Sequence, residues 1–213
     1  MHSIQFEDAH RQKHFDFFKG MNHPHFNFTV QVPFGPLLDH LKRQNLPFTP
    51  SLVYWMSRVA NELKPFRWRL RDDQIVEHDS VQPSFTVKTQ QSEVFSFCTV
   101  DYHPQAQEFI RSAQATIEAM QNNPSFEDEQ GRDDYLFMSA IPWFSFTSCQ
   151  HAMSYHPSDS VPRITWGKYF EDWNGWKIPV SVQVHHALVD GSDMGKYFQL
   201  LEGYAEQPER LFS

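Results

Sequence analysis

The chain has 213 residues, of which 40% are hydrophobic and 15% aromatic, and its formal net charge is -8 at pH 7. This length suits one sizeable domain, and the hydrophobic content excludes a disordered chain. The negative charge, without any block of Lys or Arg, argues against nucleic acid as the main partner.

No membrane segment or secretion signal is evident in the sequence. No apolar run reaches the length of about 18 residues that suggests a membrane span. The first residues, MHSIQFEDAHRQKHF, lack the apolar stretch of a signal peptide. We therefore expect a cytoplasmic protein without a membrane partner, folded as a single domain over residues 1–213.

The first part of the chain predicts a helix, a strand and a second helix. A short helix is expected around Phe15 and Phe18. Apolar and polar residues alternate in FNFTVQVPF, which predicts a half-buried strand over residues 26–34. GPLLDHLKRQN, residues 35–45, carries its leucines on one helical face.

TPSLVYWMSRVANELKPF is the clearest helix. Thr49 suits the N-cap and Pro50 the first helical position, while Pro65 ends the run. A β-hairpin around Asp72 and Asp73 is expected to follow.

The rest of the chain continues to alternate between strands and helices. Two strands are expected over residues 84–89 and 93–102, a helix over 104–120 and a polar loop over 121–134. Residues 135–149 predict a strand or two, bent near Pro142. Two more strands follow over 163–170 and 177–186, and the last helix begins near residue 192. The sum is a mixed α/β fold, a two-layer sandwich in which helices cover one large mixed β-sheet.

The segment VSVQVHHALVDG, residues 180–191, concentrates polar chemistry at the end of a strand. Alternation along that strand predicts that His185 and His186 point to opposite sides. Gly191 allows a sharp turn into the last helix. Two structural histidines, a metal site and a catalytic base are the alternatives.

A metal site lacks ligands in this pattern. Asp190 could supply an oxygen, but the segment offers no third ligand, and the pairs His10/His14 and His23/His25 do not complete a zinc signature. We therefore expect no metal. A neutral imidazole could instead accept a proton from an alcohol or thiol. Asp190 could orient that base directly or hold the turn through an arginine, and spacing alone leaves both roles open.

The motif H-H-x-x-x-D-G, closing a strand near the C-terminus, resembles the trimeric chloramphenicol acetyltransferases. It also occurs in acyltransferase cores of 2-oxo acid dehydrogenase complexes and in peptide-synthesis condensation domains. Further segments favour the first group: HFDFF, DDQIVEHDSVQPSFTV, MSAIPWFSF and ITWGKY, in matching order. The resemblance implies an acetyl-CoA-dependent acyltransferase fold, a homotrimer, and acetyl transfer from acetyl-CoA to an acceptor hydroxyl, with chloramphenicol as the leading acceptor.

The resemblance also implies individual roles. His186 would be the general base, with His185 as supporting structure. Ser139 would donate a hydrogen bond to the oxyanion of the tetrahedral intermediate. Asp190 would be structural, paired with Arg11.

Two groups of contact residues follow from the same resemblance. The acceptor would contact Phe17, Phe18, Asn22, Phe95, Phe97, Phe126, His151 and Thr165. Acetyl-CoA would contact Trp143, Lys168 and Tyr169.

The chain departs from the family pattern on both sides of this site. Asn22 and His151 stand where well-known members carry leucines, and Phe97 replaces a small residue, so we expect a narrower and more polar acceptor pocket. The family's K-x-Y-P reads PFTP at residues 47–50, which removes a lysine and a tyrosine from the coenzyme side.

Three other functions stay open. The protein could acetylate a different hydroxyl acceptor. It could be a 2-oxo acid dehydrogenase acyltransferase core, although those proteins carry lipoyl domains and linkers upstream. It could also be a non-catalytic homologue that binds and sequesters a ligand.

Overall fold

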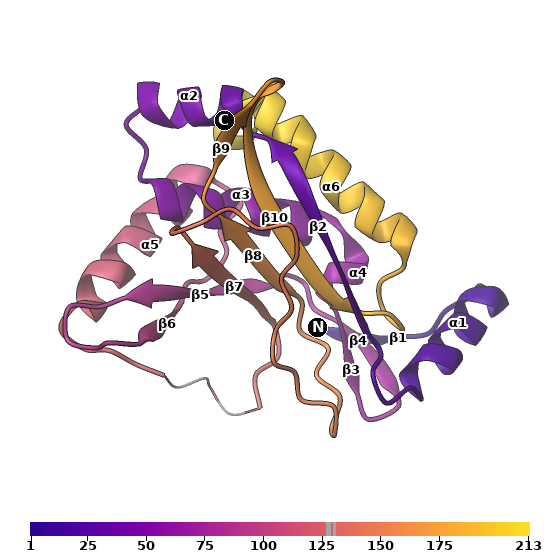
Figure 1. Cartoon of the computed structure of the whole chain (residues 1–213). Coiled ribbons are helices and arrows are strands. Elements are labelled where there is room, and N and C mark those ends of the chain that lie inside the picture. The colour runs from indigo at the N-terminus through magenta and orange to yellow at the C-terminus, as the bar shows by residue number, and fades with distance from the viewer. Residues whose placement is uncertain (127–128, 130) are drawn as a thin grey trace.

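A large mixed β-sheet forms the centre of the computed structural model, which describes residues 1–126, 129 and 131–213 (Figure 1). Among these residues the strand order is β2-β10-β8-β7-β5-β6, with β9 paired to β10. β5, β7 and β8 run parallel, and the other neighbours are antiparallel. The strands are β2 (His25–Pro33), β5 (Gln82–Lys88), β6 (Phe95–Thr99), β7 (Tyr135–Ile141), β8 (Arg163–Gly167), β9 (Phe170–Asp172) and β10 (Gly175–His185).

Helices cover one face of this sheet (Figure 1). The main ones are α2 (Gly35–Arg43), α3 (Phe48–Glu62), α5 (Ala106–Met120) and α6 (Gly191–Glu206), with short α4 (Lys64–Arg67) and α7 (Pro208–Phe212) beside them. Val180, Val182 and Val184 of β10 are buried in the core on this side. The predicted mixed α/β fold with a large helix-covered sheet is therefore confirmed.

The predicted hairpin forms, but it lies outside the large sheet. β3 (Trp68–Arg71) and β4 (Gln74–Glu77) join β1 (His2–Ile4) in a separate three-stranded sheet. Asp72 makes the turn with a positive φ of 52°. The buried Arg69 side chain donates to the carbonyls of Phe66 and Tyr135, which ties this sheet to the start of β7. The hairpin therefore lies beside the predicted large sheet and is not part of it.

Two local predictions need correction. Helix α3 begins two residues earlier than expected, so Pro47 rather than Thr49 is its N-cap, and no side chain caps it. The segment after Pro142 does not continue as a strand but runs as a loop over residues 142–162. The predicted polar loop at 121–134 forms where it is described, and its residues 127, 128 and 130 lie outside the described part.

The loop 142–162 lies against the sheet face that the helices leave open. Asn27 and Ser181 donate from β2 and β10 to the carbonyl of Cys149, at 2.8 and 3.2 Å. Gln31 donates to the carbonyl of Phe146 at 3.0 Å. Alternation along β2 and β10 thus gives one apolar face for the helices and one polar face that bonds the loop backbone.

Helix α1 (Ala9–Lys19) stands apart from the main helical layer, beside the end of β10 where α6 begins (Figure 1). Its N-cap is Asp8, whose carboxylate accepts from the His10 backbone N–H at 2.8 Å. In the described residues, none of the helices is both long and apolar enough to cross a membrane.

Candidate active site

His186 follows directly after β10, and the local backbone fixes the chemistry of its ring. Its backbone N–H donates to the carbonyl of Pro24 at 2.8 Å. Its Nδ1 lies 3.2 Å from the carbonyl oxygen of Val189. Since that carbonyl can only accept, Nδ1 carries the proton and the lone pair of the neutral ring is on Nε2.

Aromatic rings hold the His186 imidazole in place. Phe18 of α1 stacks on it with ring centroids 3.9 Å apart, and Phe26 of β2 lies at 4.4 Å. His14, also on α1, meets the ring edge-on at 5.2 Å. These contacts restrict the rotation of a half-buried imidazole and so preorganise its position.

His185 turns the other way and is buried, as alternation predicts. Its ring packs against His25 with centroids 5.0 Å apart, and its Nδ1 accepts from the Ala187 backbone N–H. Burial, with a smaller contribution from the His25 charge, lowers the pKa of His185 to about 4. This ring is therefore neutral at pH 7, and its packing and hydrogen bond give it a structural role.

The predicted pairing of Asp190 with Arg11 was wrong. Arg11 instead lies 3.3 Å from the carboxylate of Asp193 and donates to the Leu188 carbonyl at 2.6 Å. Asp190 is the N-cap of α6, and its carboxylate accepts from the backbone N–H and hydroxyl of Ser192. A carboxylate that caps a helix is turned toward the backbone of the first turn, so the next acidic residue on that turn meets the arginine.

Asp190 stays ionised in this position. Burial alone would raise its pKa, but the N–H groups of Gly191 and Ser192 hold the pKa below its usual value. Its Oδ1 lies 3.8 Å from Nε2 of His14. The side chain of Asp190 thus faces the same small space as His14 and His186.

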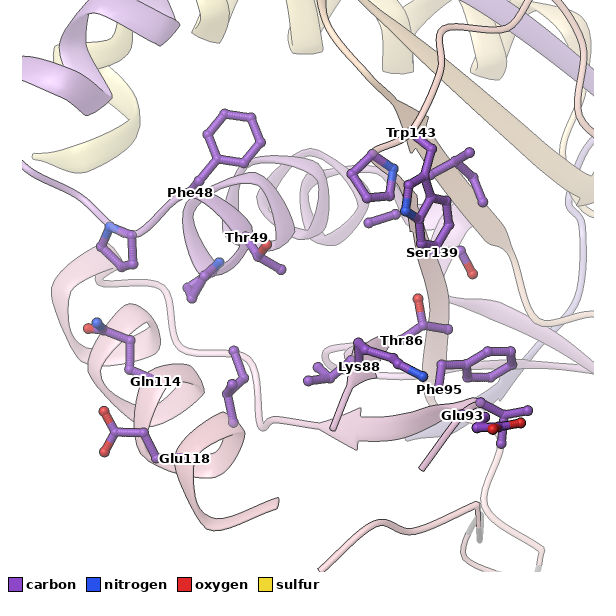
Figure 2. Close-up of a pocket in the computed structure, with 18 residues that line it drawn as sticks. Phe48, Thr49, Thr86, Lys88, Glu93, Phe95, Gln114, Glu118, Ser139 and Trp143 are labelled. Atoms are coloured by element: carbon purple, nitrogen blue, oxygen red, sulfur yellow. The ribbon is translucent and has the colours of Figure 1, made fainter. Parts of the chain in front are cut away.

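Ser139 lies on β7 and lines a largely apolar cavity of about 860 Å³ (Figure 2). Phe48 and Thr49 enter this cavity from α3, and Trp143 from the segment after β7. Its charged lining residues are Lys88, Glu93 and Glu118. The volume is in the usual range for small-molecule sites.

Three of the five aromatic residues predicted near the acceptor form one cluster beside this cavity. Phe97 lies 4.6 Å from Phe126 and 5.5 Å from Phe95, measured between ring centroids. Phe126 is 59% exposed and Phe95 is 41% exposed. Their open faces are available to a ligand or to another chain.

His151 and Thr165 meet on the loop-covered face of the sheet. The Nε2 of His151 and the Thr165 hydroxyl are 2.7 Å apart, and the His151 backbone N–H donates to the Gln183 side chain. Thr165 is fully buried. Burial lowers the pKa of His151, so its ring is neutral at pH 7. The His151 ring and the Thr165 hydroxyl therefore serve as hydrogen-bond partners for each other.

Of the predicted coenzyme residues, Trp143 lines this cavity and Tyr169 packs against a lining residue. Trp143 is 74% exposed at the rim. Tyr169 packs on Phe48 with centroids 5.8 Å apart. Lys168 is exposed, and its backbone N–H donates to the carbonyl of Phe144 at 3.0 Å.

The remaining predicted contacts come from α1 and from the turn that follows it. Phe17 is 64% exposed and packs edge-on against Phe18 at 5.1 Å. Asn22 is exposed in the turn between α1 and β2. The predicted residues therefore include one group around His186 and another around the cavity of Ser139.

The sheet register gives the distance between these two groups. Ser139 pairs with Thr165, and Thr165 pairs with Ser181, so Ser139 lies two strands from β10 at the level of Ser181. His186 is five positions beyond Ser181. Strand spacings of about 4.8 Å and rises of about 3.4 Å place the two residues roughly 20 Å apart.

Sequence reasoning missed His14 as a neighbour of His186. The signal was present, because His14 lies three residues after Arg11 and shares a helix face with it. A segment that brings Arg11 to the turn before α6 also brings His14 there.

The same fold occurs in solved acetyltransferase structures. A chloramphenicol acetyltransferase aligns with a TM-score of 0.87 and 22% identity, covering 95% of this chain and 98% of that chain. A dihydrolipoamide acetyltransferase of Azotobacter vinelandii aligns with a TM-score of 0.70 and 14% identity, covering 98% and 95%. At these identities the likeness establishes the fold.

The chain belongs to the chloramphenicol acetyltransferase family, because the family model of that description matches residues 1–202. Curated relatives agree with this. A chloramphenicol acetyltransferase from Klebsiella sp is 28% identical over 205 residues, covering 96% of this chain and 94% of the relative. One from Proteus mirabilis is 29% identical over 197 residues, covering 92% and 91%.

Proposed function

We propose that this protein transfers the acetyl group of acetyl-CoA to a hydroxyl of chloramphenicol. Family membership over residues 1–202 is the observation that carries the proposal. The same relationship favours this activity over a 2-oxo acid dehydrogenase core, because the likeness to those cores is one of fold. Residues 1–213 would act as one domain in the cytoplasm, where acetyl-CoA is available.

His186 would act as the general base. As the acceptor oxygen attacks the thioester carbonyl, Nε2 takes the hydroxyl proton. The tetrahedral intermediate then expels the coenzyme thiolate, which recovers that proton from the imidazolium. The Val189 carbonyl supports this role, since it fixes the tautomer and stabilises the positive ring.

The Ser139 hydroxyl would donate a hydrogen bond to the oxyanion of the intermediate. Its position at the cavity supports this role, because the cavity offers space for the coenzyme arm beside the Ser139 side chain. Trp143 and Tyr169 would contact the coenzyme there, and Lys168 would meet a phosphate. Pro47 and Thr49 line the cavity in place of the family lysine and tyrosine, so the coenzyme loses one cationic contact.

The active site would be formed between two copies of the chain. Both the base and the oxyanion donor must lie within about 3 Å of reacting groups. A separation of roughly 20 Å within one chain excludes that arrangement for a single copy. A closed ring of identical copies, a homotrimer in this family, would place His186 of one copy opposite Ser139 of the next.

The acceptor would then lie between Phe17 and Phe18 of one copy and Phe95, Phe97 and Phe126 of the next. Asn22 would add a polar group on the His186 side. His151 and Thr165 would shape this pocket from behind, because they bond to each other.

Product formation from acetyl-CoA and chloramphenicol, followed by chromatography, tests the proposal. His186→Ala should lower kcat by about 10²- to 10⁴-fold, the usual value of a general base. His10→Ala, at an exposed position in the first turn of α1, is the matched control and should keep wild-type turnover. Full activity of His186→Ala would show that His186 is not the general base. Acetyl transfer to other alcohols but not to chloramphenicol would show that the acceptor is a different alcohol.

A further inference from the structure

A half-buried cluster beside the end of β10 holds three metal-ligating side chains. The ligand atoms of His14, His186 and Asp190 all lie within 4.8 Å of one another. They come from α1, from the residue after β10 and from the N-cap of α6. Within one copy, the fold thus supplies the third ligand that the HHALVDG segment lacks.

The ring nitrogens of His14 lack hydrogen-bond partners in the part of the chain that the structure describes. Both of these atoms are buried. A buried imidazole without a partner is costly, so such a group calls for a ligand or a water. Burial, together with the charge of Arg11, lowers the pKa of His14, which leaves a lone pair free at pH 7.

The other two donors are also in their ligating forms. The Val189 carbonyl accepts from Nδ1 of His186, which places the lone pair of the neutral ring on Nε2. Asp190 is ionised. The nearby Arg11 charge is engaged by Asp193 and by the Leu188 carbonyl, which reduces its repulsion of a cation.

We propose that His14, His186 and Asp190 form a binding site for Zn²⁺ or a similar divalent transition-metal ion, and that the bound ion inhibits the enzyme. Two imidazoles and one carboxylate are a common zinc donor set, with the fourth position open to water. Tetrahedral ligands stand roughly 3.4 Å apart around zinc, so the ligand atoms, now within 4.8 Å of one another, need to close by up to about 1.4 Å. The inhibition, though not the binding, rests on the proposed role of His186, since the ion occupies the lone pair of the base.

Calorimetric titration of the protein with Zn²⁺, without either substrate, measures the binding directly. We expect His14→Gln to weaken binding by at least about tenfold, since even groups that only support a ligand have this effect. Asp190→Asn should also weaken it, while Asn still caps α6. His10→Gln, one turn earlier and exposed to solvent, should bind as the wild type does.

Initial rates with added Zn²⁺, followed by chromatography of the acetylated product, measure the inhibition without a thiol reagent. The rate of each variant with added Zn²⁺ is compared with the rate of the same variant in the presence of a metal chelator. Thermal unfolding of each variant verifies that it is folded. Inhibition at the calorimetric dissociation constant, relieved in His14→Gln, supports the proposal. Equal zinc affinity in wild type and His14→Gln would overturn it. If His14→Gln abolishes zinc binding but zinc does not lower the rate of the wild type, the metal site would be supported. The role of His186 as the general base would then be contradicted.

Discussion

Lowering the pH from about 7 to 5 should destabilise the folded protein through His185. The unfolded ring titrates near 6.5, whereas burial lowers the folded pKa to about 4. Between these values the unfolded chain binds a proton that the folded chain does not, so stability is lost as the pH falls through this window and retained above it. Each unit within it costs up to about 1.4 kcal/mol. Because the titration curve is rounded near 6.5, the loss between pH 7 and 5 is about 2 kcal/mol from this ring.

Urea unfolding at both pH values, at one protein concentration, measures this loss. His185→Gln removes the titrating ring, so the difference in stability between the two pH values should shrink by about 2 kcal/mol relative to the wild type. His25 stays in the variant, and burial lowers its pKa too, so part of the pH dependence should remain. An equal loss of stability in wild type and variant would refute the buried, neutral state of His185.

Three further outcomes are expected. Arg69→Met should lower the free energy of unfolding by more than about 3 kcal/mol in urea titrations, because it leaves several buried carbonyls without their donor; a loss below about 1 kcal/mol would contradict this. Ser139→Ala should lower kcat by about 10²- to 10³-fold with little change in KM, as for other oxyanion donors, whereas a change in KM alone would assign it to binding. Pro47→Lys should lower KM for acetyl-CoA by about tenfold if it restores a phosphate contact. KM for chloramphenicol is the control. An unchanged KM for acetyl-CoA would show that no coenzyme phosphate lies near residue 47.

The fold could be predicted largely from periodicity. Alternating residues marked β2 and β10, and helical spacing marked α3, α5 and α6. The small sheet was harder to predict, because β1 has only three residues and pairs with a strand more than 70 positions away. Such pairing depends on tertiary packing around the buried Arg69 rather than on a local pattern.

The site could be predicted only in part. The order of the motifs identified the segments that carry His186 and Ser139, but the distance between them needs the sheet register. The partner of Arg11 was missed because Asp190 and Asp193 lie on the same first turn of α6, and capping decides which carboxylate is free. His14 was missed because its contact with His186 joins residues at opposite ends of the chain.

The central claim is that His186 and Ser139 of different copies act on one acetyl group. Co-expression of His186→Ala and Ser139→Ala chains with different tags, followed by purification through both tags, tests it. Roughly one site in three of a mixed trimer would then combine an intact His186 with an intact Ser139, so chloramphenicol acetylation should recover well above both parents. Mixed assemblies as inactive as the parent variants would contradict a site shared between copies.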